Sequence, residues 1–225
     1  MPPPPAKRGR KAAFQTILHA KDIKVLTKKY NRLKKVTGAK IEVNFDELTD
    51  CPRDINQDDW IVINAAEFLT RVELLYSSCS LFCTQETCPM FNAGPHYHYF
   101  WEDEETQKPI QLSAPEYFQH LKRWARRTLK DPAIVPTDIG VNLSEDGATK
   151  LRSVFRRLFR IISHMYICHF SSIREFNMEP VINTMLMHYT TFGFKFALIS
   201  ATDIEMLEPV FTAMNRPLSG LGPSG

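Results

Sequence analysis

The clearest periodic pattern of apolar residues lies in the first half of the chain. Seven apolar residues recur there alternately four and three positions apart: Ile61, Ala65, Phe68, Val72, Leu75, Cys79 and Phe82. This spacing places them on one face of an α-helix. Asn56 is expected to cap the helix, and Asp58 and Asp59 fall in its first turn, where the macrodipole favours acidic side chains. The pattern therefore predicts a long amphipathic helix that ends by Pro89.

Two further helices are predicted in the middle of the chain. Ser113 and Glu116 form a capping-box pattern, with Pro115 suited to a first helical turn, so a helix should run from there to about Lys130. A second long helix is expected over residues 147–170. Its buried face comprises Leu151, Val154, Phe155, Leu158, Ile161, Ile162 and Met165.

Other elements are predicted from shorter signals. One helix should start near Pro180 and end at Gly193 as its C-terminal cap. A last helix should open at Thr202, with Glu205 completing a capping box. Residues 14–37 are expected to form a basic helix, although their apolar stripe is irregular.

The segment before the capping box has a different period. In residues 94–101, aromatic residues alternate as they do in a strand, and residues 109–112 suit a return strand. Residues 38–55 read as a loop or a short extended piece. The prediction is a mainly α fold, a helical bundle with one small β-hairpin. It consists of a basic, largely disordered arm (1–40), a helical domain (41–216) and a flexible tail (217–225).

Composition narrows the class of protein. The chain has 225 residues with 44% hydrophobic and 24% charged residues, as expected of a globular protein. It contains no run of eighteen apolar residues and no apolar stretch after Met1, so neither a membrane span nor a signal peptide is expected. The five cysteines favour a reducing compartment, the cytoplasm and as an alternative also the nucleus.

Charge is distributed unevenly along the chain. Residues 1–40 carry +11, residues 41–121 carry −12, residues 122–160 carry +6 and the remainder −2. This pattern favours a protein that meets one basic and one anionic partner. The alternative is an ordinary solvated surface with a basic tail.

Four residues have the chemistry of a metal site. Cys83 and Cys88 are separated by four residues, as are His164 and His169. Two cysteines and two histidines would form a closed tetrahedral zinc site, which is structural because no position remains for a reactive water. However, histidines five apart on a straight helix point about 140° apart. The alternative is that all four residues pack in the core.

The second long helix carries a candidate anion site. Arg156, Arg157 and Arg160 occupy neighbouring helical positions, where three guanidinium groups can converge on one phosphate. The alternative is a solvated polar face.

The start of the first long helix is a candidate docking surface. It is rich in acidic residues around one tryptophan: Asp54, Asp58, Asp59, Trp60 and Glu67. Such a surface can anchor a basic amphipathic helix of a partner. The alternative reading is helix capping with Trp60 in the core.

Enzyme motifs are absent from the sequence. It has no phosphate-binding glycine loop, nucleophile elbow, kinase signature or HExxH motif. Two rival functions remain open at this point: a nucleic-acid-binding zinc protein that uses the basic arm, and a metalloenzyme with an open zinc position.

Over residues 54–209 the sequence resembles the Mob family of kinase regulators. The motifs that carry the resemblance are Cys83-x4-Cys88-Pro89, Gly94-Pro95-x-Tyr97-x-Tyr99-x-Trp101, Lys108-Pro109, Ser113-Ala114-Pro115-x-Tyr117, Trp124 and the segment RRLFRIISHMYICHF. The resemblance implies a four-helix-bundle core with additional helices and a hairpin. It also implies a structural zinc ion on Cys83, Cys88, His164 and His169.

The resemblance further implies a non-catalytic adaptor. Such a protein binds the N-terminal regulatory region of an NDR/LATS-type AGC kinase and docks phosphothreonine peptides of an upstream Ste20-like kinase. The three arginines match the peptide site. Asp59, Trp60 and Glu67 match the kinase-binding face, to which charge alone adds Asp54 and Asp58. A phocein-like scaffold subunit of a kinase/phosphatase complex is the alternative within the family.

Overall fold

A computed structural model describes residues 43–102 and 108–214. Within these ranges the protein is mainly helical with one two-stranded sheet, as predicted. The elements are α2 (Phe45–Leu48), α3 (Gln57–Cys79), β1 (Trp101–Glu102), β2 (Pro109–Ile110), α4 (Ala114–Lys130), α5 (Glu145–Cys168), α6 (Phe170–Glu175), α7 (Glu179–Lys195), α8 (Ala201–Ile204), a 3₁₀ turn (Glu205–Leu207) and α9 (Glu208–Ala213). The basic arm, its expected helix and the tail lie outside the described residues. No helix in the described part is long and apolar enough to cross a membrane.

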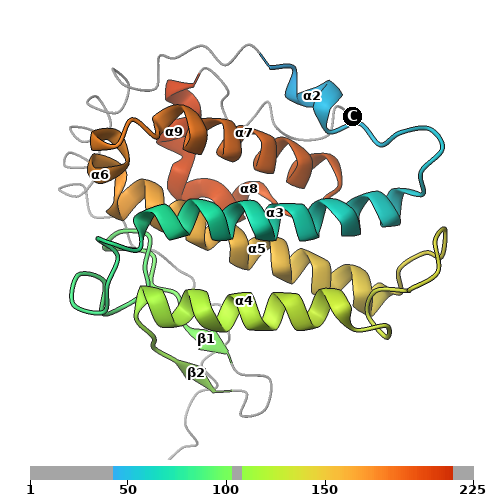
Figure 1. Ribbon diagram of the computed structural model, residues 1–225, viewed down its shortest axis with the longest axis horizontal. Helices are drawn as coiled ribbons and strands as arrows, with labels where there is room; N and C mark the ends of the chain where they lie inside the picture. The colour runs from blue at the N-terminus through green and yellow to red at the C-terminus, as the bar shows by residue number, and fades with distance from the viewer. Residues whose placement is uncertain (1–42, 103–107, 215–225) are drawn as a thin grey trace, which may run out of the picture.

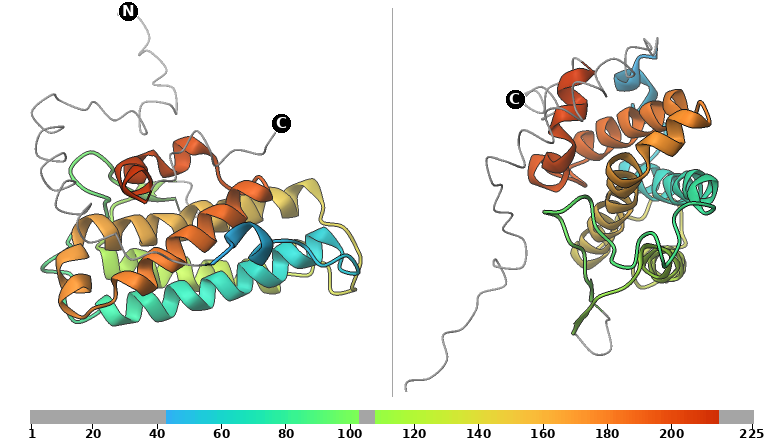
Figure 2. Two further views of the ribbon diagram at one scale, coloured as in Figure 1. Left: turned by 90° about the horizontal axis from the view of Figure 1, so that it is seen from above. Right: turned by 90° about the vertical axis from the view of Figure 1, so that its left-hand side faces the viewer.

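The four long helices α3, α4, α5 and α7 pack side by side (Figure 1). Helices α4 and α7 run opposite to α3 and α5, so consecutive long helices meet at the two ends of the bundle (Figures 1 and 2). Helix α3 packs against both α4 and α5. One end of the bundle therefore gathers the loop after α3 and the end of α5.

An aromatic cluster joins α3, α5 and α7 in the core. The ring of Phe68 lies 4.9 Å from that of Tyr189 and 5.4 Å from that of Phe192. Phe155 contacts the Tyr189 ring at 5.3 Å. All four rings are fully buried. Edge-to-face and tilted aromatic pairs add stabilisation beyond their buried area, so this cluster holds the three helices together.

Helix α3 confirms the strongest pattern in the sequence. The first six residues of its predicted apolar face are buried. The Asn56 side chain accepts hydrogen bonds from the backbone N–H groups of Asp58 and Asp59, at 2.8 and 3.3 Å. The helix ends at Cys79, so Phe82 lies beyond it and is only half-buried.

Helices α4 and α5 also follow their predictions. Ser113 and Glu116 form the expected capping box, and α4 ends at Lys130. Helix α5 begins two residues before the predicted start, because Ser144 caps it by accepting the Gly147 N–H at 3.0 Å. It ends at Cys168, and the short helix α6 follows without having been predicted.

The strand predicted over residues 94–101 is wrong for most of its length. Trp101 and Glu102 pair with Ile110 and Pro109, and His98 makes an isolated antiparallel bridge to Asn92. Gly94 adopts a left-handed φ of 87°, and the Ala93 N–H bonds to the Tyr97 carbonyl at 2.8 Å, which folds the segment into a turn. Tyr99 and Trp101 are buried by packing against side chains of α4 and α5 rather than by a sheet, whereas Tyr97 is half-buried and Phe100 is exposed. A sequence period cannot distinguish burial against helices from burial in a sheet.

Gly193 is not a helix cap. Helix α7 continues to Lys195, and the left-handed residue after it is Ala197, with φ 51°. A Cβ at Gly193 would lie 2.7 Å from the Ile199 side chain, so the glycine permits close packing of the chain that follows the helix.

Two other local predictions also need correction. The last capping box consists of Ser200 and Asp203 rather than Thr202 and Glu205, because the Asp203 carboxylate accepts the Ser200 N–H at 2.8 Å. Within 38–55, described from residue 43, the chain forms the short helix α2, which Asn44 caps.

Candidate metal centre and docking surfaces

Four buried donor side chains meet at one end of the bundle. Cys83 and Cys88 lie in the loop after α3, His164 lies in the last part of α5, and His169 lies between α5 and α6. Their ligand atoms all lie within 4.8 Å of one another. The structure therefore brings together the four residues that spacing singled out, from segments separated by 75 residues.

Both histidines present the same nitrogen to the cluster. Their Nε2 atoms are 3.1 Å apart, and each is 3.4 Å from one sulfur, His164 from Cys83 and His169 from Cys88. His169 has φ −125° and ψ 10°, outside the helical region, and so turns the chain between α5 and α6. This break removes the divergence of about 140° that a straight helix would impose.

Residues around the cluster orient its donors. The Nδ1–H of His164 donates to the Asn92 carbonyl at 2.7 Å, which leaves the Nε2 lone pair directed at the cluster. Partners of this kind fix the tautomer of ligating histidines. The Tyr76 hydroxyl lies 3.2 Å from the Cys83 sulfur. Asn92 and Tyr76 could not be predicted from the sequence, because a backbone carbonyl and a core tyrosine leave no motif.

Burial sets the protonation of the cluster. It lowers the pKa of His164 to about 4 and also lowers the pKa of His169, so both rings are neutral near pH 7. Burial raises the pKa of the Cys83 thiol, so a thiolate there needs a neighbouring cation. Neutral imidazoles with thiols that ionise on a cation are the donor set of a metal site, and the four residues could hold a metal ion.

The three α5 arginines have different neighbours. The Arg156 side chain is 48% exposed, and its Nε lies 3.3 Å from the Asp203 carboxylate. Arg157 lies over the rings of Trp101 and Trp124, at 4.4 and 4.5 Å. Their convergence on one anion stays a prediction.

Arg160 is anchored more deeply than its position on α5 suggested. Its Nη1 donates to the Tyr117 hydroxyl at 3.0 Å, and its guanidinium lies 5.0 Å from the Tyr99 ring. Tyr99, Trp101, Tyr117 and Trp124 were named in the sequence motifs, but their contacts with the arginines were not predicted. The alternation of residues 97–101 pointed to a strand instead.

The first acidic residues of α3 support a loop. Asp58 accepts the Leu143 N–H at 2.8 Å, and Asp59 accepts the Gly140 N–H at 2.7 Å. One carboxylate oxygen of each residue is thereby engaged within the protein. These two carboxylates hold residues 131–144 against the start of α3.

The other residues of the predicted kinase-binding face differ in their exposure and in their contacts. Asp54 is exposed before the helix. Trp60 is half-buried against the core, and its indole N–H donates to the Thr49 carbonyl at 3.4 Å. Glu67 is exposed and pairs with Arg71 at 2.7 Å. The five residues thus do not form one cluster, and their role in binding a partner stays a prediction.

Comparison with known proteins gives consistent matches. Residues 38–207 match the Mob1/phocein family. The chain is 33% identical to "Maintenance of ploidy protein mob1" of Schizosaccharomyces pombe, over 75% of this chain and 80% of the relative. It is 31% identical to "MOB kinase activator-like 1A" of Arabidopsis thaliana, over 77% and 81%. It is 32% identical to "MOB kinase activator-like 1 homolog A" of Dictyostelium discoideum, over 92% and 97%.

Proposed function

Because the chain belongs to the Mob1/phocein family, we propose that it is a non-catalytic adaptor that activates a protein kinase. The kinase is of the NDR/LATS type, and the adaptor binds its N-terminal regulatory region. A phosphothreonine peptide of an upstream Ste20-like kinase docks on the α5 arginines. The relatives named kinase activators support the regulatory role, and the arginines of α5 are the observation that carries the peptide site.

Zinc is the ion that best suits the four-residue cluster. With Zn–N near 2.05 Å and Zn–S near 2.3 Å, a tetrahedron has edges of about 3.3 Å between nitrogens and about 3.5 Å between nitrogen and sulfur. The corresponding separations here are 3.1 and 3.4 Å. Four protein ligands leave no open position, so the ion would link α3 to α5 and take no part in hydrolysis.

The α5 arginines suit a phosphate group. Arg156 is exposed and paired only with a carboxylate among the contacts described, so a phosphate with nearly two negative charges can compete for it. The rings of Trp101 and Trp124 lie against Arg157 and restrict its orientation. A guanidinium fixed by its faces still offers its N–H edge to an oxyanion.

The outward side of α3 suits a basic amphipathic segment. Ile63 is 58% exposed, and Glu67 and Thr70 follow it at intervals of four and three residues on the same exposed side. An apolar residue beside a carboxylate can receive both the apolar and the basic side chains of a partner helix. Binding there would order the kinase segment and shift the kinase toward its active state, a population change without chemistry.

Calorimetry with a phosphothreonine peptide tests the peptide site. Replacing Arg156, Arg157 and Arg160 together by alanine should abolish binding, whereas replacing Arg123, Arg126 and Arg127 on α4 should leave it unchanged. The result contradicts the assignment if the first variant binds normally or if the unphosphorylated peptide binds equally well.

A milder pair of variants guards against misfolding. Arg156→Ala changes only an exposed side chain and should still weaken binding. Asp203→Asn removes the competing charge and should strengthen it. An unchanged affinity in both would place the phosphate elsewhere, even if the triple variant had failed to fold.

Affinity for the regulatory segment of a candidate kinase tests the α3 surface. Ile63→Asp with Glu67→Lys should weaken binding at least about tenfold, since it removes an apolar contact and reverses a charge. Ile139, which is 94% exposed on the 131–144 loop, provides a control as Ile139→Asp. Equal losses in both variants would contradict the assignment.

A further inference from the structure

Helix α4 has a strongly basic outward side, which the adaptor role above does not use. We call it the α4 basic face. It comprises Lys122, Arg123, Arg126, Arg127 and Lys130. Four of these side chains are exposed and Lys122 is half-buried. The helix has one acidic residue, Glu116, which serves in the capping box, and none from Tyr117 to Lys130.

The stability of helix α4 explains only part of the positive charge on its basic face. Arg127 and Lys130 lie in the last turn, where cations complement the macrodipole. Lys122 and Arg123 lie in the middle of the helix, where that benefit is absent. Arg126 pairs with Glu73 of α3 at 2.6 Å, and its side chain remains 57% exposed. The face therefore concentrates positive charge beyond what the helix requires.

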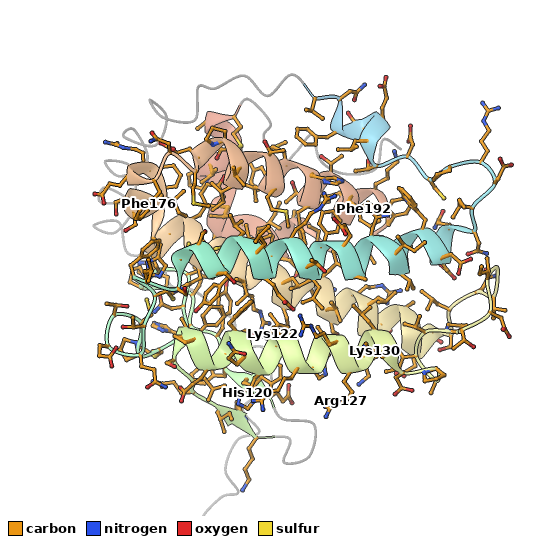
Figure 3. The ribbon with its side chains drawn as sticks, viewed as in Figure 1. His120, Lys122, Arg127, Lys130, Phe176 and Phe192 are labelled. Carbon is orange, nitrogen blue, oxygen red and sulfur yellow. The ribbon has the colours of Figure 1, made fainter. Side chains whose placement is uncertain are left out.

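The scaffold beneath the face is rigid. Tyr117, Phe118, Leu121 and Trp124 are all buried on the inner side of α4. The basic side chains thus project from a fixed helix, and Figure 3 shows Lys122, Arg127 and Lys130 distributed along it. Residues four apart on a helix are separated by about 6 Å along its axis, so the cations form short parallel rows.

The surroundings of α4 disfavour a nucleic acid as the partner. Helices α3 and α4 lie side by side in both Figure 1 and the right-hand view of Figure 2 and pack against each other. A surface two helices wide cannot enter a major groove of about 12 Å. The aromatic side chains of α4 point inward, so none is available to stack on the bases of a single strand.

The convex shape of the α4 basic face favours a planar anionic surface as its partner. The interface of a bilayer that contains anionic lipids is such a surface. An acidic peptide would gain little from the convex crest of a helix, whereas a planar surface can contact its whole length.

We propose that the α4 basic face is a peripheral docking surface for bilayers that contain anionic phospholipids. The guanidinium and ammonium groups contact lipid phosphates and carboxylates. The 12 lysines and arginines of residues 1–40 supply a second cationic segment on the same chain. Each lysine or arginine near an anionic surface adds to the attraction, so two cationic segments on one chain should bind such a membrane more strongly than either alone.

Vesicle sedimentation with the zinc-loaded full chain tests the proposal. Vesicles contain phosphatidylcholine alone or with phosphatidylserine, and binding should require phosphatidylserine and weaken at high salt. Arg123→Glu with Lys130→Glu should reduce binding at least about tenfold. Arg53→Glu with Arg174→Glu is the control, since it changes net charge equally at two exposed positions away from α4.

Three outcomes of the vesicle experiment would contradict the proposal. Equal loss in the two charge-reversal variants would mean that net charge alone drives binding, and no loss in either would mean that the arm suffices. Binding to duplex DNA or polyglutamate that depends on Arg123 and Lys130, without binding to the vesicles, would assign the face to another partner.

Two further measurements serve as controls. All four substituted positions are exposed, so unchanged melting temperatures should confirm that the variants fold. Phosphothreonine-peptide affinity should be unaffected, which separates this test from that of the adaptor function.

Discussion

His188 illustrates how one buried side chain responds to its neighbours. It lies on α7 and is 8% exposed, and its Nδ1 is 3.1 Å from the Nη1 of Arg71 on α3. Because a guanidinium can only donate, this nitrogen must be the unprotonated one. Burial, together with the Arg71 charge, lowers the pKa of His188 to about 4 from its ordinary 6.5. Protonation would break the contact and place two cations side by side.

This arrangement predicts an acid-sensitive contribution to stability. Between about pH 4 and 6.5 the unfolded chain binds a proton at His188 that the folded protein does not, so the free energy of unfolding should fall as the pH is lowered through this range. The His188→Gln variant should lose on the order of 2 kcal/mol less between pH 7 and pH 4. Denaturant unfolding of both proteins, each loaded with metal, gives the comparison. Identical pH dependence would show that His188 does not carry this linkage.

At the level of elements, the start of α3 has two roles. Its first-turn carboxylates complement the helix macrodipole, and they also accept N–H groups of the 131–144 loop, which connects α4 to α5. That loop contains no helix or strand of its own, so hydrogen bonds to α3 help to define its path. One pair of side chains therefore couples the start of α3 to the entry into α5.

Removing the Asp58 carboxylate should loosen this loop. Asp58→Ala leaves the half-buried Leu143 N–H without its acceptor and should cost about 1–2 kcal/mol. Hydrogen exchange should quicken at Leu143, while Asp58→Asn, which keeps an acceptor oxygen, should change less. The exposed Asp54 provides the control as Asp54→Ala. Unaltered exchange at Leu143 in Asp58→Ala would show that the loop is held by other contacts.

At the scale of the molecule, a metal ion bound by the four-residue cluster would be a long-range cross-link. It would tie the loop after α3 to the junction of α5 and α6, and 75 residues separate Cys88 from His164. Closing so long a loop reduces the conformational entropy of the unfolded chain, so the binding energy of an ion becomes folding energy. Without an ion, the ligand atoms of these four buried side chains would lie against one another with no cation to stabilise a thiolate.

The purified protein should therefore contain one zinc ion per chain. Chelation should lower its melting temperature by several degrees or more, as expected when a structural zinc site is lost. Cys83→Ser should have the same effect. Cys51→Ser is the matched control, because Cys51 is outside the four-residue cluster and its thiol contacts the Pro52 and Ile55 carbonyls instead. Elemental analysis without stoichiometric metal, together with unchanged melting after chelation, would disprove the site.

The sequence alone determined the features that depend on near neighbours. The apolar face of α3, the Asn56 cap and the Ser113 capping box follow from contacts within a few positions, and the paired cysteines and histidines are recognisable by residue type. Tertiary structure decided how these parts meet. Only packing reveals that His169 breaks the helix so that four donors converge, that Gly193 makes room for Ile199, and that aromatic residues near 99 pack on helices instead of forming a strand. These outcomes depend on atoms that are distant in sequence or on the space that remains around them, and a local period carries no record of either.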